Sequence, residues 1–402
     1  MRVVMFYHSL VSDWNHGNAH FLRGIASELL SRGCDVVIFE PEDAWSVEQL
    51  VRDQGSTPLD RFHAAYPGLR SRRYDPRNFD VREALRGADL VIVHEWNPPR
   101  LVAAIGEHHK SHPSYVLLFH DTHHRMVTQP EQMSACDLSG YDGVLAYGNV
   151  LRDLYLSRGL ARRAWTWHEA ADVRRFAPQP GVQPDADLVW IGNWGDDERS
   201  RELHEFIIEP VRALGLRARF HGVRYPAEAR RALDSAGIEY AGWLPNFEVP
   251  AVFARHRVTV HVPRRPYVEA LPGIPTIRPF EALACGIPLV CAPWRDSEGL
   301  FTAGRDYLGA RDGAEMTEYL ARLVRSREAR DTLAAHGLRT VRTRHTCAHR
   351  VGELFAIAHD VRRSNPARRR VILAGDPAPA LARDIAVVES TRNTSQGVEN
   401  VT

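Results

Sequence analysis

A polar loop near the start of the chain could carry proton transfer. The segment HSLVSDWNHGNAH (8–20) follows an apolar run, leads into a helical pattern and holds three histidines. Imidazole titrates near neutral pH, and such a loop can turn backbone N–H groups towards a ligand. We take His16 as a candidate catalytic base and Asn18 as a candidate substrate contact; a solvated loop with incidental histidines is the alternative. The loop lacks GxGxxG, which argues against a nicotinamide-dependent dehydrogenase.

The segment FHDTHHR (119–125) is a second dense set of polar side chains, and it also follows an apolar run. His120 or Asp121 could act there as a general base or bind sugar hydroxyls, and a polar loop over a cleft is the alternative. Metal binding is less favoured, because the adjacent His123 and His124 would face opposite ways on an extended chain. We therefore predict no metal site.

The segment IGNWGDDERSR (191–201) has the pattern of a strand, a glycine loop and a helix. Backbone around Gly192 and Asn193 could approach a phosphate, and Arg199 could neutralise it. The acidic residues between them are as well explained by the dipole of the following helix. Gly192, Asn193 and Arg199 are candidates for binding an anionic ligand.

The segment HVPRRPYVEALPGIPTIRPFEALACGIPLV (261–290) also has the features of an anion site. A glycine, Gly273, precedes a helix start, and the arginines Arg264, Arg265 and Arg278 lie nearby in the sequence. Helix N-termini bind anions, and guanidinium groups grip phosphates in pairs of hydrogen bonds. The segment therefore predicts a diphosphate-binding site.

The start of this helix is ambiguous. If Pro279 is its first residue, Arg278 is the N-cap and Glu281 is a capping glutamate in the first turn. If the helix starts at Gly273, Pro279 must kink it. In both cases Gly286 is placed to end the helix. Capping is thus one explanation for Glu281, and ligand binding is the other.

The elements that position these residues are indicated by continuous apolar runs, among them DLVIVHEW (89–96) and YVLLFHD (115–121), and by helical patterns such as AHFLRGIASELLS (19–31) and RELHEFIIEPVRALG (201–215). Runs of this kind, with helical patterns between them, are typical of parallel strands covered on both faces. A Pro-rich stretch at 172–187 interrupts the alternation, which then restarts. We predict an α/β fold of two doubly wound Rossmann-like domains facing across a cleft, with ligands at the carboxyl ends of the strands. The predicted segments are a first domain (1–172), a linker (173–186), a second domain (187–345), a C-terminal helix (346–364) and a flexible tail (365–402).

Composition excludes several classes of protein. Apolar residues make up 44 % and charged residues 25 % of the 402 residues, as in ordinary globular proteins. The net charge of +1 gives no field that would recruit nucleic acid. Five scattered cysteines suggest neither disulfides nor zinc, and a short β-branched start is unlike a signal peptide, so we expect a cytoplasmic protein. The basic C-terminal tail is a solvated segment or a weak contact with anionic lipid.

Several motifs together resemble a known family. HGNAHFLRGIASELLSRGCDVVIF, DLVIVHEW, LFHD, WHEAADVRRFAP and TIRPFEALACGIPLV, followed by GLFTAGRDYLGARD, occur in order over roughly residues 1–360. The chain resembles GT-B-fold glycosyltransferases of the family-4-like group (glycosyl transferases group 1), and most closely the spore-maturation-protein branch. Arg278 lies at a position where members of that branch commonly carry an arginine.

The resemblance implies a nucleotide-diphosphate sugar as donor, with no other cofactor. Glu281 would bind the donor ribose, and backbone at Gly273 and Ile274 would meet the diphosphate together with Arg199. The N-terminal domain would hold the acceptor, so His94 at the end of its strand joins Asn18 and His123 on the acceptor side.

One residue departs from the family pattern. Many family members carry two glutamates separated by seven residues, and the first of them falls on Gly273. The contact made by that glutamate is therefore absent here or supplied by another residue.

We accordingly predict a metal-independent glycosyltransferase, retaining by analogy, that acts on a glycan, lipid-linked or small-molecule acceptor and not on nucleic acid. A His or Asp base would suit inversion instead. Two alternatives stay open, a non-hydrolysing nucleotide-sugar epimerase and a non-catalytic sugar-nucleotide-binding partner protein.

Overall fold

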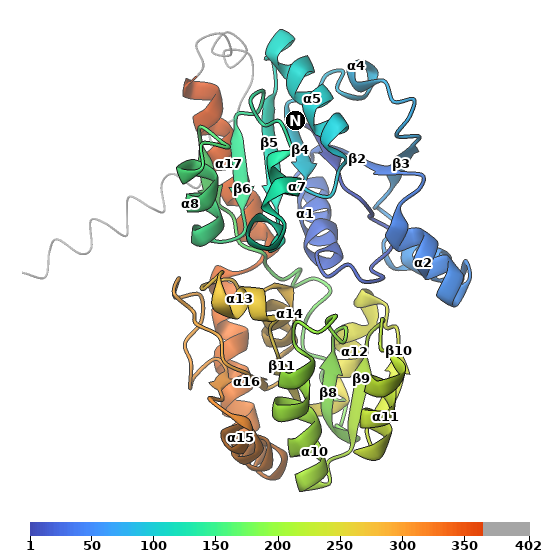
Figure 1. The fold of residues 1–402 in the computed structure, drawn as a ribbon, viewed down its shortest axis with the longest axis vertical. Coiled ribbons are helices and arrows are strands. Elements are labelled where there is room, and N and C mark those ends of the chain that lie inside the picture. Colours follow the sequence, from blue (N-terminus) through green and yellow to red (C-terminus); the bar gives the residue numbers. More distant parts are fainter. Residues whose placement is uncertain (365–402) are drawn as a thin grey trace, which may run out of the picture. The chain divides into compact units, whose positions relative to one another are not determined.

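The structure is a computed structural model that describes residues 1–364 of the chain. Residues Met1–His359 form one compact unit, in which two parallel sheets are each flanked by helices (Figure 1). The predicted tail, 365–402, and its proposed lipid contact lie outside the described residues. No helix of residues 1–364 is long and apolar enough to cross a membrane.

The N-terminal domain is built on a seven-stranded parallel sheet in the order β3-β2-β1-β4-β5-β6-β7. Its strands are β1 (Arg2–Phe6), β2 (Asp35–Pro41), β3 (Ser71–Tyr74), β4 (Leu90–His94), β5 (Val116–Asp121), β6 (Gly143–Ala146) and β7 (Ala164–Thr166). The helices are α1 (Ala19–Ser31), α2 (Trp45–Gln54), α3 (Thr57–Ala65), α4 (Val81–Ala84), α5 (Pro99–Ser111), α6 (Arg125–Thr128), α7 (Pro130–Ser134) and α8 (Asn149–Ser157).

The C-terminal domain repeats this arrangement with a six-stranded parallel sheet, β10-β9-β8-β11-β12-β13. Its strands are β8 (Ala186–Ile191), β9 (Ala218–His221), β10 (Glu239–Gly242), β11 (His256–His261), β12 (Leu289–Cys291) and β13 (Leu308–Gly309). The helical elements are α9 (Ser200–Leu203), η1 (His204–Ile208), α10 (Glu209–Leu214), α11 (Ala227–Ser235), η2 (Asn246–Glu248), α12 (Val249–Ala254), α13 (Arg265–Glu269), α14 (Ile277–Cys285), α15 (Gly313–Arg325), α16 (Arg327–Arg344) and α17 (Cys347–Ser364).

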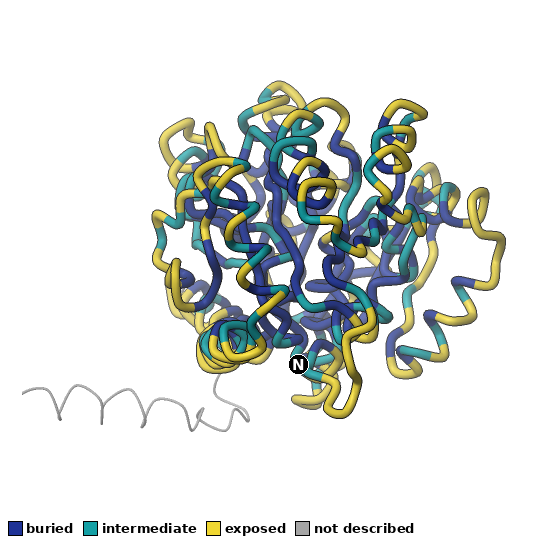
Figure 2. The backbone as a smooth tube through the Cα atoms, turned by 90° about the horizontal axis from the view of Figure 1, so that it is seen from below, coloured by how far each residue is buried: buried dark blue, intermediate teal, exposed yellow. Residues whose placement is uncertain are grey.

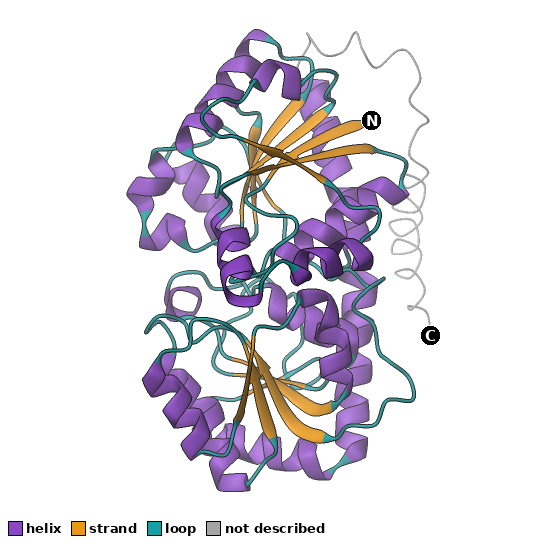
Figure 3. Ribbon diagram, turned by 90° about the vertical axis from the view of Figure 1, so that its right-hand side faces the viewer, coloured by secondary structure: helices purple, strands orange, loops and turns teal. Residues whose placement is uncertain are grey.

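The central strands form because their apolar runs are buried on both faces. Every residue of β4, β5 and β6 is buried, and β1 pairs in parallel with both β2 and β4. Figure 3 shows each layer of strands lying between helices, and Figure 2 shows the buried backbone at the centre. The predicted fold class, two doubly wound α/β domains, is therefore confirmed.

The strand order places the functional loops. The order of the first sheet reverses between β1 and β4, and that of the second reverses between β8 and β11. Ligands of doubly wound sheets bind outside the carboxyl ends of strands at such switch points. The loop after β1 and the loop after β8 begin at these two points.

The chain links the domains at the hinge and again at its C-terminal helix. It leaves the first sheet at Thr166 and enters the second at Ala186. At the start of α17, the Cys347 backbone N–H donates to Ala171 O at 2.9 Å. The Trp167 indole donates to Arg350 O, also at 2.9 Å. The first turn of α17 is thereby fixed to the hinge.

Two predicted helices differ from the structure. Residues 201–215 were expected to form one regular helix, but a π-helical stretch, η1, separates α9 from α10. Pro210 follows η1 and has no N–H to give to the preceding turn, which is where the hydrogen-bond pattern changes. Helix α14 begins at Ile277, not at Gly273 or Pro279, so Glu281 lies beyond its first turn and is not a capping residue. Gly286 ends α14 in the left-handed conformation, as predicted.

Candidate functional site

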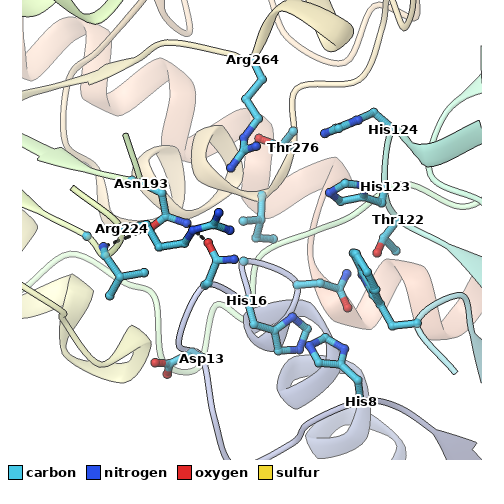
Figure 4. A pocket seen from close by; sticks show the side chains of 18 of the residues that line it. His8, Asp13, His16, Thr122, His123, His124, Asn193, Arg224, Arg264 and Thr276 are labelled. Carbon is cyan, nitrogen blue, oxygen red and sulfur yellow. Dashed lines mark hydrogen bonds between the residues drawn. The ribbon is translucent and has the colours of Figure 1, made fainter. Parts of the chain in front are cut away.

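A cavity of about 840 Å³ lies between the carboxyl ends of the strands of the two sheets. Its volume suits a ligand of nucleotide size. In Figure 4, Arg264 and Asn193 of the C-terminal domain face the same space as His16 and His123 of the N-terminal domain. Eight of the predicted site residues line it: His16, Asn18, His123, Gly192, Asn193, Arg199, Arg264 and Arg278.

Two helix N-termini meet at this cavity. Asn18 is the N-cap of α1, Thr276 is the N-cap of α14, and both residues line the cavity. A side-chain carbon added at Gly17 would lie 3.6 Å from Ile277 Cγ2, so the two helix starts are in contact range. Neither helix has an acidic residue in its first turn. The partial positive charges of both ends are thus left for a ligand.

Arg199 adds a full positive charge that forms no ion pair with a carboxylate of residues 1–364. Its guanidinium donates to two backbone carbonyls, Val262 O at 3.0 Å and Asn193 O at 2.6 Å. The guanidinium carbon lies 5.1 Å from the centre of the Trp190 ring. Burial, followed by the nearby guanidinium of Arg264, lowers the pKa of Arg199 to about 9. A bound anion would stabilise the charged guanidinium and so oppose the lowering of its pKa by burial and by Arg264. Arg199 is therefore suited to an anionic ligand.

The other two cavity arginines each have an acidic partner. Arg264 donates to Glu198 at 2.7 Å, and Arg278 contacts Glu281 one helical turn away. Both side chains are partly exposed, at 21 % and 17 %. Arg264 can therefore turn to a ligand and leave only the partly exposed Glu198, whereas Arg278 stays beside the fully buried Glu281.

Glu281 lies behind the cavity wall. Its carboxylate is fully buried and does not line the cavity. It accepts from Asn246 Nδ2 at 2.7 Å and lies 3.0 Å from His20 Nδ1, which belongs to α1 of the other domain. Although burial would raise it, the pKa of the carboxyl is held below its ordinary value by Arg278, His20 and Asn246. Glu281 thus links the two domains, and its predicted contact with a ribose stays a prediction.

Gly273 and Ile274 also lie at the domain interface rather than on the cavity wall. Gly273 has φ 92°, and a side chain there would meet Glu298 Cγ at 2.6 Å. Ile274 is buried in the apolar core of the N-terminal domain, against Gly148. The Glu298 side chain thus occupies the space beside Gly273, which explains physically why residue 273 is a glycine.

The loop after β8 is joined to the loop after β1. Asn193 Nδ2 donates to Asn15 Oδ1 of the N-terminal domain, and Asn193 Oδ1 accepts the Val223 backbone N–H at 3.2 Å. In the same region Asp13 accepts from Trp243 Nε1 at 3.1 Å. These bonds hold the two loops together over the cavity.

His16 lines the cavity as part of a histidine pair. Its ring centre lies 3.8 Å from that of His8. Burial, and then the neighbouring His8 and Arg23, lower the pKa of His16 well below its usual range. The ring is therefore neutral at physiological pH and is a weak base.

His94, His120 and Asp121 form a buried cluster at the ends of β4 and β5, away from the cavity. His120 Nδ1 is 2.7 Å from the Tyr7 hydroxyl, and burial lowers the pKa of His120 to about 3. The Asp121 carboxylate accepts from Tyr155 and from the His123 backbone N–H. The geometry thus gives His120 and Asp121 structural partners and no access to a cavity ligand.

His123 and His124 correct the expectation that adjacent histidines face opposite ways. Their ring centres are only 4.0 Å apart, and both line the cavity. The backbone is not extended there, because Asp121 accepts the His123 N–H in a turn and His124 is the N-cap of α6. Residues 1–364 hold no group of three or more His, Cys, Asp or Glu placed to bind a metal.

The sequence reasoning missed Glu169 and two tryptophans. Glu169 follows β7 in the hinge, lines the cavity and is 5 % exposed. Trp45 and Trp96 line the N-terminal part of the cavity and are 49 % and 43 % exposed. The Arg125 guanidinium lies 3.9 Å from the Trp96 ring centre. Large exposed aromatics cannot be recognised from sequence, because most tryptophans are buried.

The C-terminal domain matches a known family. Residues 199–356 match the model of the family described as glycosyl transferase-like. No curated protein matches the sequence at a significant level.

Solved structures cover nearly the whole described chain. An alpha-glucosyltransferase in complex with UDP and a 13-mer DNA matches with TM-score 0.63 at 12% identity, over 89% of this chain and 99% of that one. Anabaena HepE in complex with UDP and glucose matches with TM-score 0.61 at 13% identity, over 89% and 100%. Sucrose-phosphate synthase from Thermosynechococcus elongatus matches with TM-score 0.59 at 14% identity, over 89% and 99%.

The chain has the GT-B fold. The solved structures confirm the predicted fold of two Rossmann-like domains, and residues 199–356 are similar to the glycosyl transferase-like family. The spore-maturation branch is not named by these comparisons and stays a prediction.

Proposed function

We propose that this protein transfers a sugar from a nucleotide-diphosphate sugar, with UDP as the nucleotide, to an acceptor held by the N-terminal domain. The observation that carries the proposal is the pair of helix N-termini, α1 and α14, that meet beside Arg199, Arg264 and Arg278. Structurally similar proteins contain UDP or UDP-glucose, which supports the choice of nucleotide.

The same groups supply the chemistry. As the glycosidic bond breaks, negative charge builds on the leaving diphosphate, and fixed cations and N–H groups around it lower the barrier. Arg199 is held in place by backbone carbonyls and needs no rearrangement to do this. We propose a metal-independent reaction on this ground, so that EDTA leaves the rate of UDP release unchanged.

Several finer points rest on the resemblance or on composition. Retention of anomeric configuration and the spore-maturation branch follow from the resemblance alone. A glycan, lipid-linked or small-molecule acceptor is preferred to nucleic acid because the net charge is only +1. The five free cysteines fit a cytoplasmic enzyme.

Calorimetry with UDP on a matched pair of variants tests the proposal. Arg264 lines the cavity, whereas the adjacent Arg265 pairs with Glu202 and does not. Arg264→Ala should weaken UDP binding about tenfold, since a hydrogen bond to a charged group contributes about 1.5–3 kcal/mol. Arg265→Ala should change it less than about twofold.

Equal losses in the two variants, or no UDP binding by the wild type, would contradict the proposed donor site. Incubation with UDP-glucose then separates the enzyme classes. Release of UDP indicates transfer or hydrolysis, formation of an epimer without an acceptor indicates an epimerase, and binding without any turnover indicates a non-catalytic protein.

A further inference from the structure

Glu169 is an unusual carboxyl group within the cavity. Of the other carboxylates on the cavity wall, Asp13, Asp196 and Glu198 pair with arginines at 2.8, 3.0 and 2.7 Å. Asp43 is exposed. Glu169 is buried, at 5 % exposure, and forms no ion pair with any residue in the described part of the chain. Burying a carboxyl group without a cation disfavours its charged form.

The carboxyl group is held at the point where the two helix N-termini meet. Its Oε1 accepts from the side-chain amide of Asn18, the N-cap of α1, at 3.0 Å. The preceding residue, His168, is fixed from α17, because Arg350 Nε donates to His168 O at 2.8 Å. Oε2 has no hydrogen-bond partner among residues 1–364. One oxygen is therefore anchored and the other is free for a ligand in the anion site.

The surroundings of Glu169 favour its protonated form. Burial raises the pKa of Glu169 to about 8; Asn18 opposes this and Glu281 of α14 adds to it. Two further titratable groups interact electrostatically with Glu169, Tyr267 of α13 and Tyr147 after β6. Both are neutral, because burial raises the pKa of each phenol. A bound diphosphate would raise the pKa further by repulsion between like charges. Glu169 is thus a carboxylic acid at neutral pH, and it can donate a proton.

We propose that Glu169 is the general acid of this site and donates its proton to the leaving nucleoside diphosphate. This inference rests on the proposed function. The bond between sugar C1 and the β-phosphate oxygen breaks, and its electron pair goes to that oxygen, which accepts the Glu169 proton. The acceptor hydroxyl forms the new bond to C1 and releases one proton, which restores the acid directly or through solvent. Because Glu169 acts on the leaving group, the step is compatible with retention and with inversion.

Proton uptake on UDP binding tests this without requiring turnover. Calorimetry in two buffers of different ionisation enthalpy gives the number of protons taken up. At pH 8 about half of the free wild-type carboxyl is ionised and UDP should re-protonate it, so about half a proton is taken up. Glu169→Gln keeps the shape and the Asn18 hydrogen bond but cannot titrate. In this variant only the protons taken up by the UDP phosphates should remain, and the additional uptake by residue 169 should vanish.

The second measurement is the rate of UDP release from UDP-glucose against pH. At UDP-glucose concentrations well below KM, where the free enzyme titrates, wild-type release should fall as the pH rises through about 8, because the acid form is lost. Glu169→Gln should lower the rate at pH 7 about a hundredfold, the usual size of an acid–base contribution, and remove this alkaline limb. Glu318→Gln, at an exposed carboxylate of α15 that does not line the cavity, should keep both the rate and the limb.

Each contrary result points to a different error. Equal proton uptake in wild type and Glu169→Gln, or a release rate that rises through pH 8, overturns the acid role. Altered uptake with an unchanged rate also overturns it and leaves Glu169 as a binding group only. Absence of UDP binding in the wild type overturns the proposed function itself, and the inference falls with it.

Discussion

Replacing Glu281 with glutamine should destabilise the protein more than it weakens nucleotide binding. The carboxylate is fully buried, is bonded by Asn246 at 2.7 Å, lies 3.0 Å from His20, and contacts Arg278. Glutamine keeps the volume but offers one acceptor oxygen in place of two. Its amide N–H₂ must then face one of the surrounding hydrogen-bond donors. His20 is one of these donors, because its Nε2 accepts the Asp172 backbone N–H and its ring proton is therefore on Nδ1, the atom next to residue 281.

The size of the effect follows from the partners. Removing one member of a buried ion pair costs about 3–5 kcal/mol. Arg278 is 17 % exposed and can turn to solvent in the cavity, which reduces the penalty of leaving it unpaired. We therefore expect the free energy of unfolding to fall by about 3 kcal/mol, at the low end of that range.

Urea denaturation with an unchanged m-value measures this loss. Glu318→Gln, at an exposed position on α15, is the matched control and should change stability by less than about 0.5 kcal/mol. A loss below about 1 kcal/mol in Glu281→Gln, together with a large drop in UDP affinity, would refute the interdomain role. It would instead support a direct contact with the donor ribose.

The stability of wild type and of Glu281→Gln can also be compared as a function of pH. The pKa of Glu281 is lower in the folded state than its ordinary value. Its contribution to stability is therefore fully present above the unfolded-state pKa of about 4.3 and is lost as the pH falls through the folded-state value. The stability difference between wild type and Glu281→Gln should be constant near neutrality and shrink below about pH 4.

Two further predictions concern the interface and the acceptor side. Gly273→Ala should destabilise by about 3 kcal/mol, because it combines positive φ with a 2.6 Å approach to Glu298. Gly33→Ala, at φ 77° with no atom within 4 Å, should lose only about 1 kcal/mol, and equal thermal shifts in the two would contradict this account. Trp96→Ala should leave UDP affinity within about twofold while it lowers transfer relative to hydrolysis of UDP-glucose, since Trp96 and Arg125 belong to the N-terminal wall. A larger loss of UDP affinity by calorimetry would place the nucleotide elsewhere.

The central elements could be predicted because their signals are local. The helix Ala19–Ser31 has the bounds expected from its apolar spacing, and β4 and β5 lie within the predicted apolar runs. The edge strands β3, β7 and β10 gave no such signal. Their residues are mostly half-buried or exposed, so no continuous apolar run marks them.

The arginines of the cavity were also accessible from sequence, since the predicted Arg199, Arg264 and Arg278 all line it. Two glycine loops after strands, with arginines beside helix starts, are local patterns. Polar residues at strand ends were not equally informative. Asp121 is occupied by Tyr155 and His123, whereas Glu169, in a hinge segment with no distinguishing pattern, faces the cavity.

The sequence by itself thus determined the fold class, the alternation of strands and helices and the glycine- and arginine-containing segments that line the cavity, because each depends on the periodicity and composition of neighbouring residues. Only the tertiary structure decided which side of the cavity wall each acidic side chain occupies. Glu281 is turned towards His20 on α1, and Glu169 is turned towards Asn18 on the same helix. Those partners lie more than a hundred residues away in the chain, so burial, protonation state and role depend on how the two domains close around the cavity.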